Sequence, residues 1–183
     1  MAADRTWSIS AEWVLTGSGV SIRRGVLRLR GGRIEAVGPT GKVPPARRHR
    51  SLGEVTVLPG LINAHTHLEL SHLRGELPAG RPLVQWLFGV ARRMPRGRDV
   101  DAAVADGAAE ALACGTTAVA DTCHNGSAWR TLKQTPLRSV CLAEVMGIGP
   151  AARGAVPRLE KAVRGLRSTS RMKFGLAPHA PYS

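Results

Sequence analysis

The stretch VTVLPGLINAHTHLELS, residues 55–71, decides the fold of this chain. Its apolar run is interrupted by Pro59-Gly60 and then leads into His65, His67 and Glu69, which follow one another at two-residue intervals. In an extended strand, side chains two residues apart lie on the same face. We therefore expect these three side chains to point the same way from the end of a buried strand, where two imidazoles would form half of a metal site.

Two histidines at alternate positions also have a simpler interpretation, because a chain with six histidines can bring two of them close together by chance. The apolar run before them favours metal binding, since a solvated pair would stand in polar sequence. On this basis we assign His65 and His67 as metal ligands. The role of Glu69 stays open between orienting a ligating imidazole and contacting a substrate.

The composition argues against several classes of protein. The chain carries a net charge of +13, but aromatic residues make up only 4% of it, so a nucleic-acid binding surface is not indicated. Cys114, Cys123 and Cys141 are odd in number and lack the spacing of a zinc ribbon. No apolar run approaches the roughly 18 residues of a membrane span. We expect a soluble, cytoplasmic protein with neither nucleic acid nor membrane as a partner.

The predicted elements divide the chain into two domains. Residues 7–37 alternate apolar and polar side chains on either side of Gly31-Gly32, which predicts an antiparallel hairpin because glycine readily adopts positive φ. Residues 38–51 are rich in proline and are expected to form a linker. We assign residues 1–54 to a small β-sandwich portion with its linker, and residues 55–183 to a second domain.

The second domain alternates short apolar strands with helices, which is typical of a parallel sheet covered by helices. Strands are expected within residues 55–71 and at 117–121, 139–145 and 172–177, with helices near 83–90, 100–114, 127–134 and 157–166. Trp86 lies on the apolar side of the first helix, where the spacing alone predicts a core residue.

The carboxyl ends of these strands carry polar side chains. Chemistry gathers at this edge of a parallel sheet. The residues concerned are His65, His67, Glu69, Asp121, Cys123, His124, Glu144 and His179. Because four consecutive strands end in this way, a catalytic or metal-binding edge is a better explanation than coincidence.

Four segments of the chain resemble the amidohydrolase superfamily. They are LPGLINAHTHLELSHLRG (residues 58–75), PLVQWL (residues 82–87), ACGTTAVAD (residues 113–121) and GLAPHAPYS (residues 175–183). The segments follow the family's order, and the first and last are the specific ones. The resemblance is to the branch of cytosine-deaminase-like and chlorohydrolase-like enzymes, which includes deaminases of adenosine, S-adenosylhomocysteine and aminodeoxyfutalosine.

The resemblance implies a (β/α)8 TIM barrel beside a small β-sandwich built from both chain ends. It implies that His65 and His67 bind one divalent metal ion, zinc with iron as the alternative. It also implies substrate contacts for His179, Glu69 and Trp86, and Trp86 would then line the pocket. Binuclear relatives carry a carboxylated lysine at the end of the fourth strand, where this chain has none, so a single ion is favoured.

The resemblance further implies a third histidine, a glutamate and an aspartate that have no counterpart before Ser183. A complete barrel takes about 250 residues. We therefore expect residues 55–183 to form the N-terminal half of the barrel, strands 1 to 4, and residues 1–183 to be inactive alone. Open strand edges favour pairing of two copies, so a homo-oligomer is one expected outcome.

The function implied for the intact enzyme is metal-dependent hydrolytic deamination of a small amine-bearing heterocycle, such as a purine nucleoside. One alternative on the same scaffold is the removal of a different ring substituent, as in chlorohydrolases. A second alternative is a non-catalytic, truncated homologue that acts as an interaction module. The first half of a barrel does not separate these functions, because much of the specificity would lie in later loops.

Overall fold

The computed structural model describes residues 6–147 and 149–179, which form two compact units on either side of the Pro59–Gly60 bond. This boundary falls later than the expected one after Glu54, because Thr56–Val57 pairs with the first strand of the N-terminal unit. The two units are described separately below. Among the described residues, no helix is both long and apolar enough to cross a membrane.

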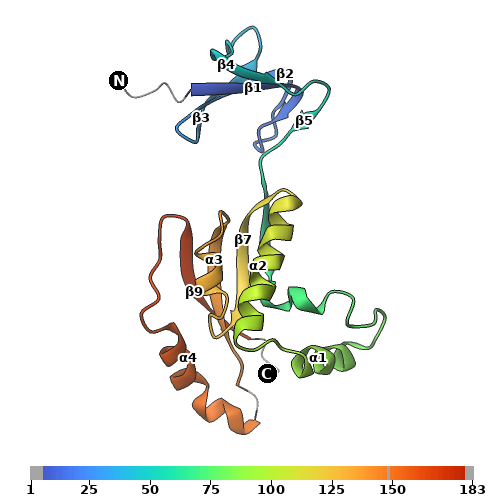
Figure 1. Cartoon of the computed structure of the whole chain (residues 1–183), viewed down its shortest axis with the longest axis vertical. Coiled ribbons are helices and arrows are strands. Elements are labelled where there is room, and N and C mark those ends of the chain that lie inside the picture. The colour runs from blue at the N-terminus through green and yellow to red at the C-terminus, as the bar shows by residue number, and fades with distance from the viewer. Residues whose placement is uncertain (1–5, 148, 180–183) are drawn as a thin grey trace. The chain divides into compact units, whose positions relative to one another are not determined.

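The N-terminal unit is a five-stranded sheet with the order β3-β2-β1-β4, and β5 also pairs with β1 (Figure 1). Strands β1, β2 and β3 are antiparallel, whereas β4 and β5 run parallel to β1. The strands are β1 (Thr6–Leu15), β2 (Ser21–Arg30), β3 (Arg33–Pro39), β4 (Arg48–Ser51) and β5 (Thr56–Val57). The predicted hairpin across Gly31-Gly32 is confirmed, with φ values of 56° and 79° at the two glycines.

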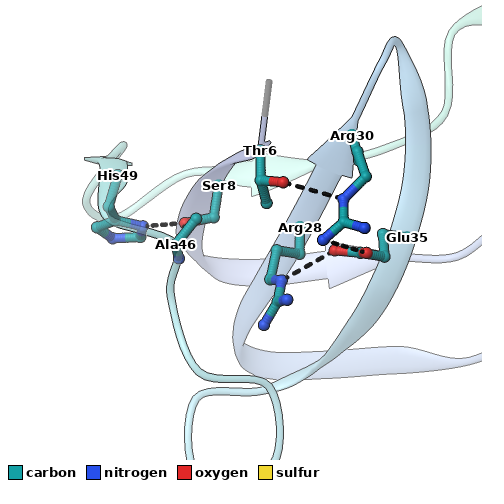
Figure 2. A network of polar contacts seen from close by, with 7 residues as sticks. All are labelled: Thr6, Ser8, Arg28, Arg30, Glu35, Ala46 and His49. Carbon is teal, nitrogen blue, oxygen red and sulfur yellow. Dashed lines mark hydrogen bonds and ion pairs between the residues drawn. The ribbon is translucent and has the colours of Figure 1, made fainter. Parts of the chain in front are cut away.

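The end of the predicted linker is a strand, so the expectation of an irregular segment up to residue 51 was wrong there. Strand β4 carries no apolar alternation, and all of its residues are exposed. It pairs in parallel with β1, and the His49 ring lies within hydrogen-bond distance of both Ser8 Oγ (2.8 Å) and Ser10 Oγ (3.1 Å) of that strand. Figure 2 shows Ser8 between His49 and the backbone N–H of Ala46, which donates to Ser8 Oγ at 2.9 Å.

The second unit is a mixed α/β structure around a four-stranded parallel sheet of order β6-β7-β8-β9. Its strands are β6 (Leu61–Thr66), β7 (Thr116–His124), β8 (Arg138–Val145) and β9 (Met172–Pro178). The helices are η1 (Leu68–Leu73), α1 (Leu83–Arg92), α2 (Arg98–Ala113), α3 (Trp129–Leu132), η2 (Gly149–Gly154) and α4 (Ala155–Val163), of which η1 and η2 are 3₁₀ helices. The predicted alternation of helices with parallel strands is confirmed.

The core of the second unit lies between α2 and the sheet, and Figure 1 shows α2 running alongside β7. Helix α2 contributes Val104 and Ala108, and β7 contributes Val119 and Cys123. The side chain of Leu68 from η1 packs into the same cluster. This packing fixes the chain directly after His67, so the fold determines the backbone from which the candidate metal ligands project.

Candidate functional site

The carboxyl ends of the four parallel strands meet at one edge of the sheet. In the strand register, Thr66 lies opposite Asp121, and His124 lies opposite Glu144. The end of β9 lies beside the end of β8 in the same way, because Val145 lies opposite Pro178. The polar residues that the sequence places at the strand ends therefore come from neighbouring positions of a single sheet edge.

His65 and His67 lie side by side at the end of β6. Their ring centroids are 5.0 Å apart, with an angle of 82° between the ring planes. His65 is exposed and its backbone N–H donates to Asn63 Oδ1 at 3.2 Å, whereas His67 is half-buried. The sequence prediction that these two imidazoles come together is consistent with this geometry.

The two imidazoles fit part of a metal site. Bonds of about 2.1 Å from one tetrahedral ion to two imidazole nitrogens put the ring centroids on the order of 5 Å apart. Within residues 6–147 and 149–179, however, no group of three or more histidine, cysteine, aspartate or glutamate side chains is arranged to hold a metal ion. His65 and His67 are thus two candidate ligands, whereas catalytic zinc sites use three from the protein.

Glu69 does not share a strand face with the histidines, so that part of the sequence prediction was wrong. Strand β6 ends at Thr66, and Glu69 belongs to η1, where its side chain is 3% exposed. The backbone N–H of His124 donates to Glu69 Oε1 at 2.9 Å, and the Ser127 hydroxyl donates to Glu69 Oε2. One carboxylate oxygen therefore binds the last residue of β7, and the other binds the turn that follows this strand.

Asp121 on β7 makes the reverse connection. The backbone N–H of Leu68 donates to Asp121 Oδ1 at 2.7 Å, and Asp121 is completely buried. Its Oδ2 has no hydrogen-bond partner among the described residues. Burial, together with the nearby charge of Glu69, raises the pKa of Asp121 from 3.8 to about 7, although the Leu68 hydrogen bond lowers it. An ionised carboxylate at this position is disfavoured because it loses hydration.

His179 follows β9 and lies near Glu144 of β8. The distance from His179 Nε2 to Glu144 Oε1 is 3.9 Å, and the backbone N–H of His179 donates to the Val145 carbonyl at 3.1 Å. Glu144 is buried. The last residues of the GLAPHAPYS segment, 180–183, lie outside the described residues.

Trp86 lies on α1, a helix without any buried side chain among its residues. The indole is 40% exposed, and so the core role that helical spacing predicted for it was wrong. The role of Trp86 in substrate binding stays a prediction.

One of the strand-end residues, Cys123, has a packing role, and one contact residue was missed. Cys123 and Cys141 are buried, with their sulfur atoms 3.4 Å apart. The contact with Cys141, together with burial, raises the pKa of the Cys123 thiol, so the reactive thiolate is disfavoured. Ser127 was not predicted, because no local pattern marks a serine that binds a carboxylate 58 residues away.

Comparison with known proteins relates most of the chain to the amidohydrolase family. Residues 56–183 match the model of the amidohydrolase family. A 5-methylthioadenosine/S-adenosylhomocysteine deaminase of Symbiobacterium thermophilum is 30% identical over 181 residues, which cover 92% of this chain and 41% of the relative. These curated relatives match most of this chain, but the chain spans only about two fifths of their length.

Solved structures show the same fold. An adenosine deaminase of Xanthomonas campestris with bound zinc is 26% identical in sequence and has a TM-score of 0.71. The aligned part covers 96% of this chain and 43% of the deaminase. A Helicobacter pylori aminofutalosine deaminase in complex with methylthio-coformycin is 22% identical with a TM-score of 0.77, and the aligned part covers 96% of this chain and 44% of the deaminase. The arrangement of the α/β elements is therefore that of these enzymes.

Proposed function

The chain belongs to the amidohydrolase family, and from this premise we propose that the protein carrying it is a metal-dependent hydrolytic deaminase. The proposed substrate is a small heterocycle with an exocyclic amine, such as adenosine, 5′-methylthioadenosine or S-adenosylhomocysteine. The observation that carries the proposal is the placement of His65 and His67, with ring centroids 5.0 Å apart at the end of β6. The names of the deaminases that the chain is similar to support the substrate class.

In this proposal, His65 and His67 hold one divalent ion, zinc with iron as the alternative. The zinc bound to the Xanthomonas campestris relative supports this choice. Such an ion, when bound, supplies the Lewis acidity that makes water a nucleophile near neutral pH. His179 and Trp86 contribute substrate contacts, and Glu144, 3.9 Å from the His179 ring, limits the orientations of that imidazole.

The proposed architecture follows from the sheet order and the structural relatives. The four parallel strands β6 to β9 correspond to strands 1 to 4 of a (β/α)8 barrel. The N-terminal sheet corresponds to part of a β-sandwich beside that barrel. The exposed edges of β6 and β9 make a homo-oligomer one proposed state of these residues.

We test the function by measuring ammonia release from the three adenine nucleosides named above, with the zinc-loaded protein expressed from its complete reading frame. His67→Ala is expected to abolish turnover, because one of the two proposed ligands is lost. His49→Gln is the matched control, since His49 lies in the N-terminal unit, and it is expected to retain activity. Zinc-loaded protein that releases no ammonia from any of the three substrates would overturn the proposal.

We also propose that residues 1–183 alone do not turn over substrate. Two metal ligands, His65 and His67, are proposed, no group of three or more candidate ligands occurs among the described residues, and catalytic zinc sites use three from the protein. The same ammonia assay on purified residues 1–183 is expected to give no signal above the His67→Ala background. Turnover that depends on His67 would show that residues 1–183 are sufficient.

A further inference from the structure

Two buried carboxylates cross between the ends of β6 and β7. Glu69, two residues after His67, binds the backbone N–H of His124 and the hydroxyl of Ser127 beyond the end of β7. Asp121, within β7, binds the backbone N–H of Leu68, the residue directly after His67. Each segment therefore holds the other through a carboxylate, and the Thr66–Asp121 strand pair lies between the two contacts.

The burial of both carboxylates makes these connections stiff. Glu69 is 3% exposed and Asp121 is 0% exposed. A hydrogen bond to an ionised carboxylate is shorter and roughly twice as strong as one between neutral groups, and Glu69 accepts two hydrogen bonds. If the pairing were lost, the buried Leu68 N–H and the partly buried His124 N–H would be left without their acceptors, which is unfavourable because a donor shielded from water finds no replacement partner. The backbone on the carboxyl side of His67 therefore has little freedom to move.

We propose that Glu69 and Asp121 form a reciprocal carboxylate latch that positions His67 and His124 at the catalytic edge of the sheet. Glu69 is a positioning residue and not a substrate contact, because both of its oxygens are occupied and its side chain is buried. The latch binds backbone N–H groups, so it fixes the backbone positions from which the imidazole side chains project. It does not contact the metal ion or the substrate.

A positioning role of this kind has a measurable size in metalloproteins. Mutation of residues that orient metal ligands costs about 10–100-fold in metal affinity or activity. In this chain, the latch holds the two residues that follow His67, and it fixes His124 through its backbone N–H. Loss of Glu69 is therefore expected to loosen one ligand and one neighbouring histidine together.

The test rests on the proposed metal site and uses the protein from its complete reading frame. We compare the wild type with Glu69→Ala and Glu69→Gln, and with Glu110→Ala as the matched control. Glu110 is a half-exposed glutamate of the neighbouring helix α2 that pairs with Arg74 and has no contact in the latch. The readouts are Zn²⁺ affinity by chelator competition, the visible spectrum of the Co²⁺ form, and hydrogen exchange of the Leu68 and His124 amides.

Glu69→Ala is expected to weaken Zn²⁺ binding at least about 10-fold and to alter the Co²⁺ spectrum. It is also expected to speed exchange at His124, the amide that loses its acceptor. Glu69→Gln is expected to fall between Glu69→Ala and the wild type, because its amide oxygen can still accept from the His124 N–H. Glu110→Ala is expected to match the wild type in all three readouts.

Wild-type affinity, spectrum and exchange in Glu69→Ala would overturn the latch. If Glu69→Ala does not fold, Ser127→Ala decides, because it removes one partner of Glu69 and leaves the carboxylate in place. Unchanged Zn²⁺ affinity and an unchanged Co²⁺ spectrum in Ser127→Ala and Glu69→Gln would then reject the proposal. A wild type that binds Zn²⁺ but releases no ammonia rejects the deaminase function alone, so the two failures are distinguishable.

Discussion

The carboxylates of the two units are held in different ways. In the N-terminal unit, Glu35 pairs with Arg28 and Arg30 on the sheet surface, and the three side chains are between 30% and 61% exposed (Figure 2). In the second unit, Glu69 and Asp121 are buried and accept hydrogen bonds from backbone N–H groups. Both sets of contacts bridge neighbouring segments of the chain, but only the second set is shielded from water.

The difference in exposure decides what each carboxylate can do. An exposed ion pair exchanges its partners for water at little cost, and its contribution to stability has a median of about 0–1 kcal/mol. A buried carboxylate cannot replace its protein partners with water, so its position depends on the groups that it binds. We therefore expect changes in the second unit to have large effects, and comparable changes in the N-terminal unit to have small ones.

The largest expected effect is a pH dependence of stability caused by Asp121. Its pKa is raised from 3.8 to about 7 in the folded protein, so the folded state holds a proton that the unfolded state releases. Stability is then greatest below the unfolded pKa and falls as the pH rises through the folded one. A shift of this size corresponds to a loss of about 4 kcal/mol across that range.

Urea unfolding at several pH values between about 4 and 7 measures this loss. Asp121→Asn is the informative variant, since its side-chain oxygen can still accept from the Leu68 N–H but does not titrate. In this variant, the fall of the unfolding free energy with rising pH is expected to disappear. A slope equal to that of the wild type would show that another group is responsible.

A smaller effect is expected from Gly107→Ala, which tests the packing that holds the latch. A Cβ at Gly107 would collide with the Ser71 hydroxyl, which would have to rotate away, and would lie 3.1 Å from Ser71 Cβ and 3.2 Å from Leu68 Cδ2, so these side chains of η1 would have to shift by a few tenths of an ångström. Overpacking costs about 1–3 kcal/mol and alanine gains about 1 kcal/mol of helix propensity, which leaves an expected net loss of up to about 2 kcal/mol.

The control for this substitution lies in the N-terminal unit. A Cβ at Gly41 would meet no atom within 4 Å, and Gly41 is not among the glycines with positive φ, so Gly41→Ala is expected to leave the unfolding free energy unchanged or to raise it slightly. Urea denaturation measures both variants. Equal effects at the two glycines would remove the contrast between the tightly packed and the open positions.

A still smaller loss, about 1 kcal/mol, is expected from Ser8→Ala, which removes a buried acceptor in the N-terminal unit. The Ser8 hydroxyl accepts from the Ala46 N–H at 2.9 Å and lies 2.8 Å from the His49 ring, as Figure 2 shows. Thermal or urea unfolding measures the change, and Ser10→Ala is the control, because its bond to His49 is exposed. A loss in Ser10→Ala as large as in Ser8→Ala would contradict this ranking by burial.

The parts of the site that the sequence predicted are those set by local geometry. The two-residue spacing of His65 and His67 decides which face of a strand they share, and the structure brings their rings together. Glu69 was misplaced because the chain leaves the strand at Thr66, where Leu68 turns into the core against α2. That turn depends on packing against residues far away in the sequence, and the local spacing of apolar and polar residues carries no information about such contacts.

The same limit explains the misassigned elements. Strand β4 was missed because its residues are all exposed, and it is held by parallel pairing with β1 and by contacts of His49 with the hydroxyls of Ser8 and Ser10. Helical periodicity correctly predicted that α1 is a helix, but it could not predict that none of its residues is buried. Periodicity identifies the side of a helix that can be buried, whereas burial itself depends on what packs against that side.

The smallest expected effect comes from Glu35→Gln, which removes the charge that holds Arg28 and Arg30 in the N-terminal sheet. We expect a loss below about 1 kcal/mol, further reduced by salt, because the ion pairs are exposed to water. Urea unfolding at low and high salt measures it, with Glu54→Gln as a control at another exposed glutamate of the same unit. If Glu35→Gln cost as much as the titration of Asp121, exposure would not be what separates the two units. The contrast would then have to lie in the number of bonds that each carboxylate makes, since Glu35 binds two arginines and Asp121 Oδ1 binds a single backbone N–H.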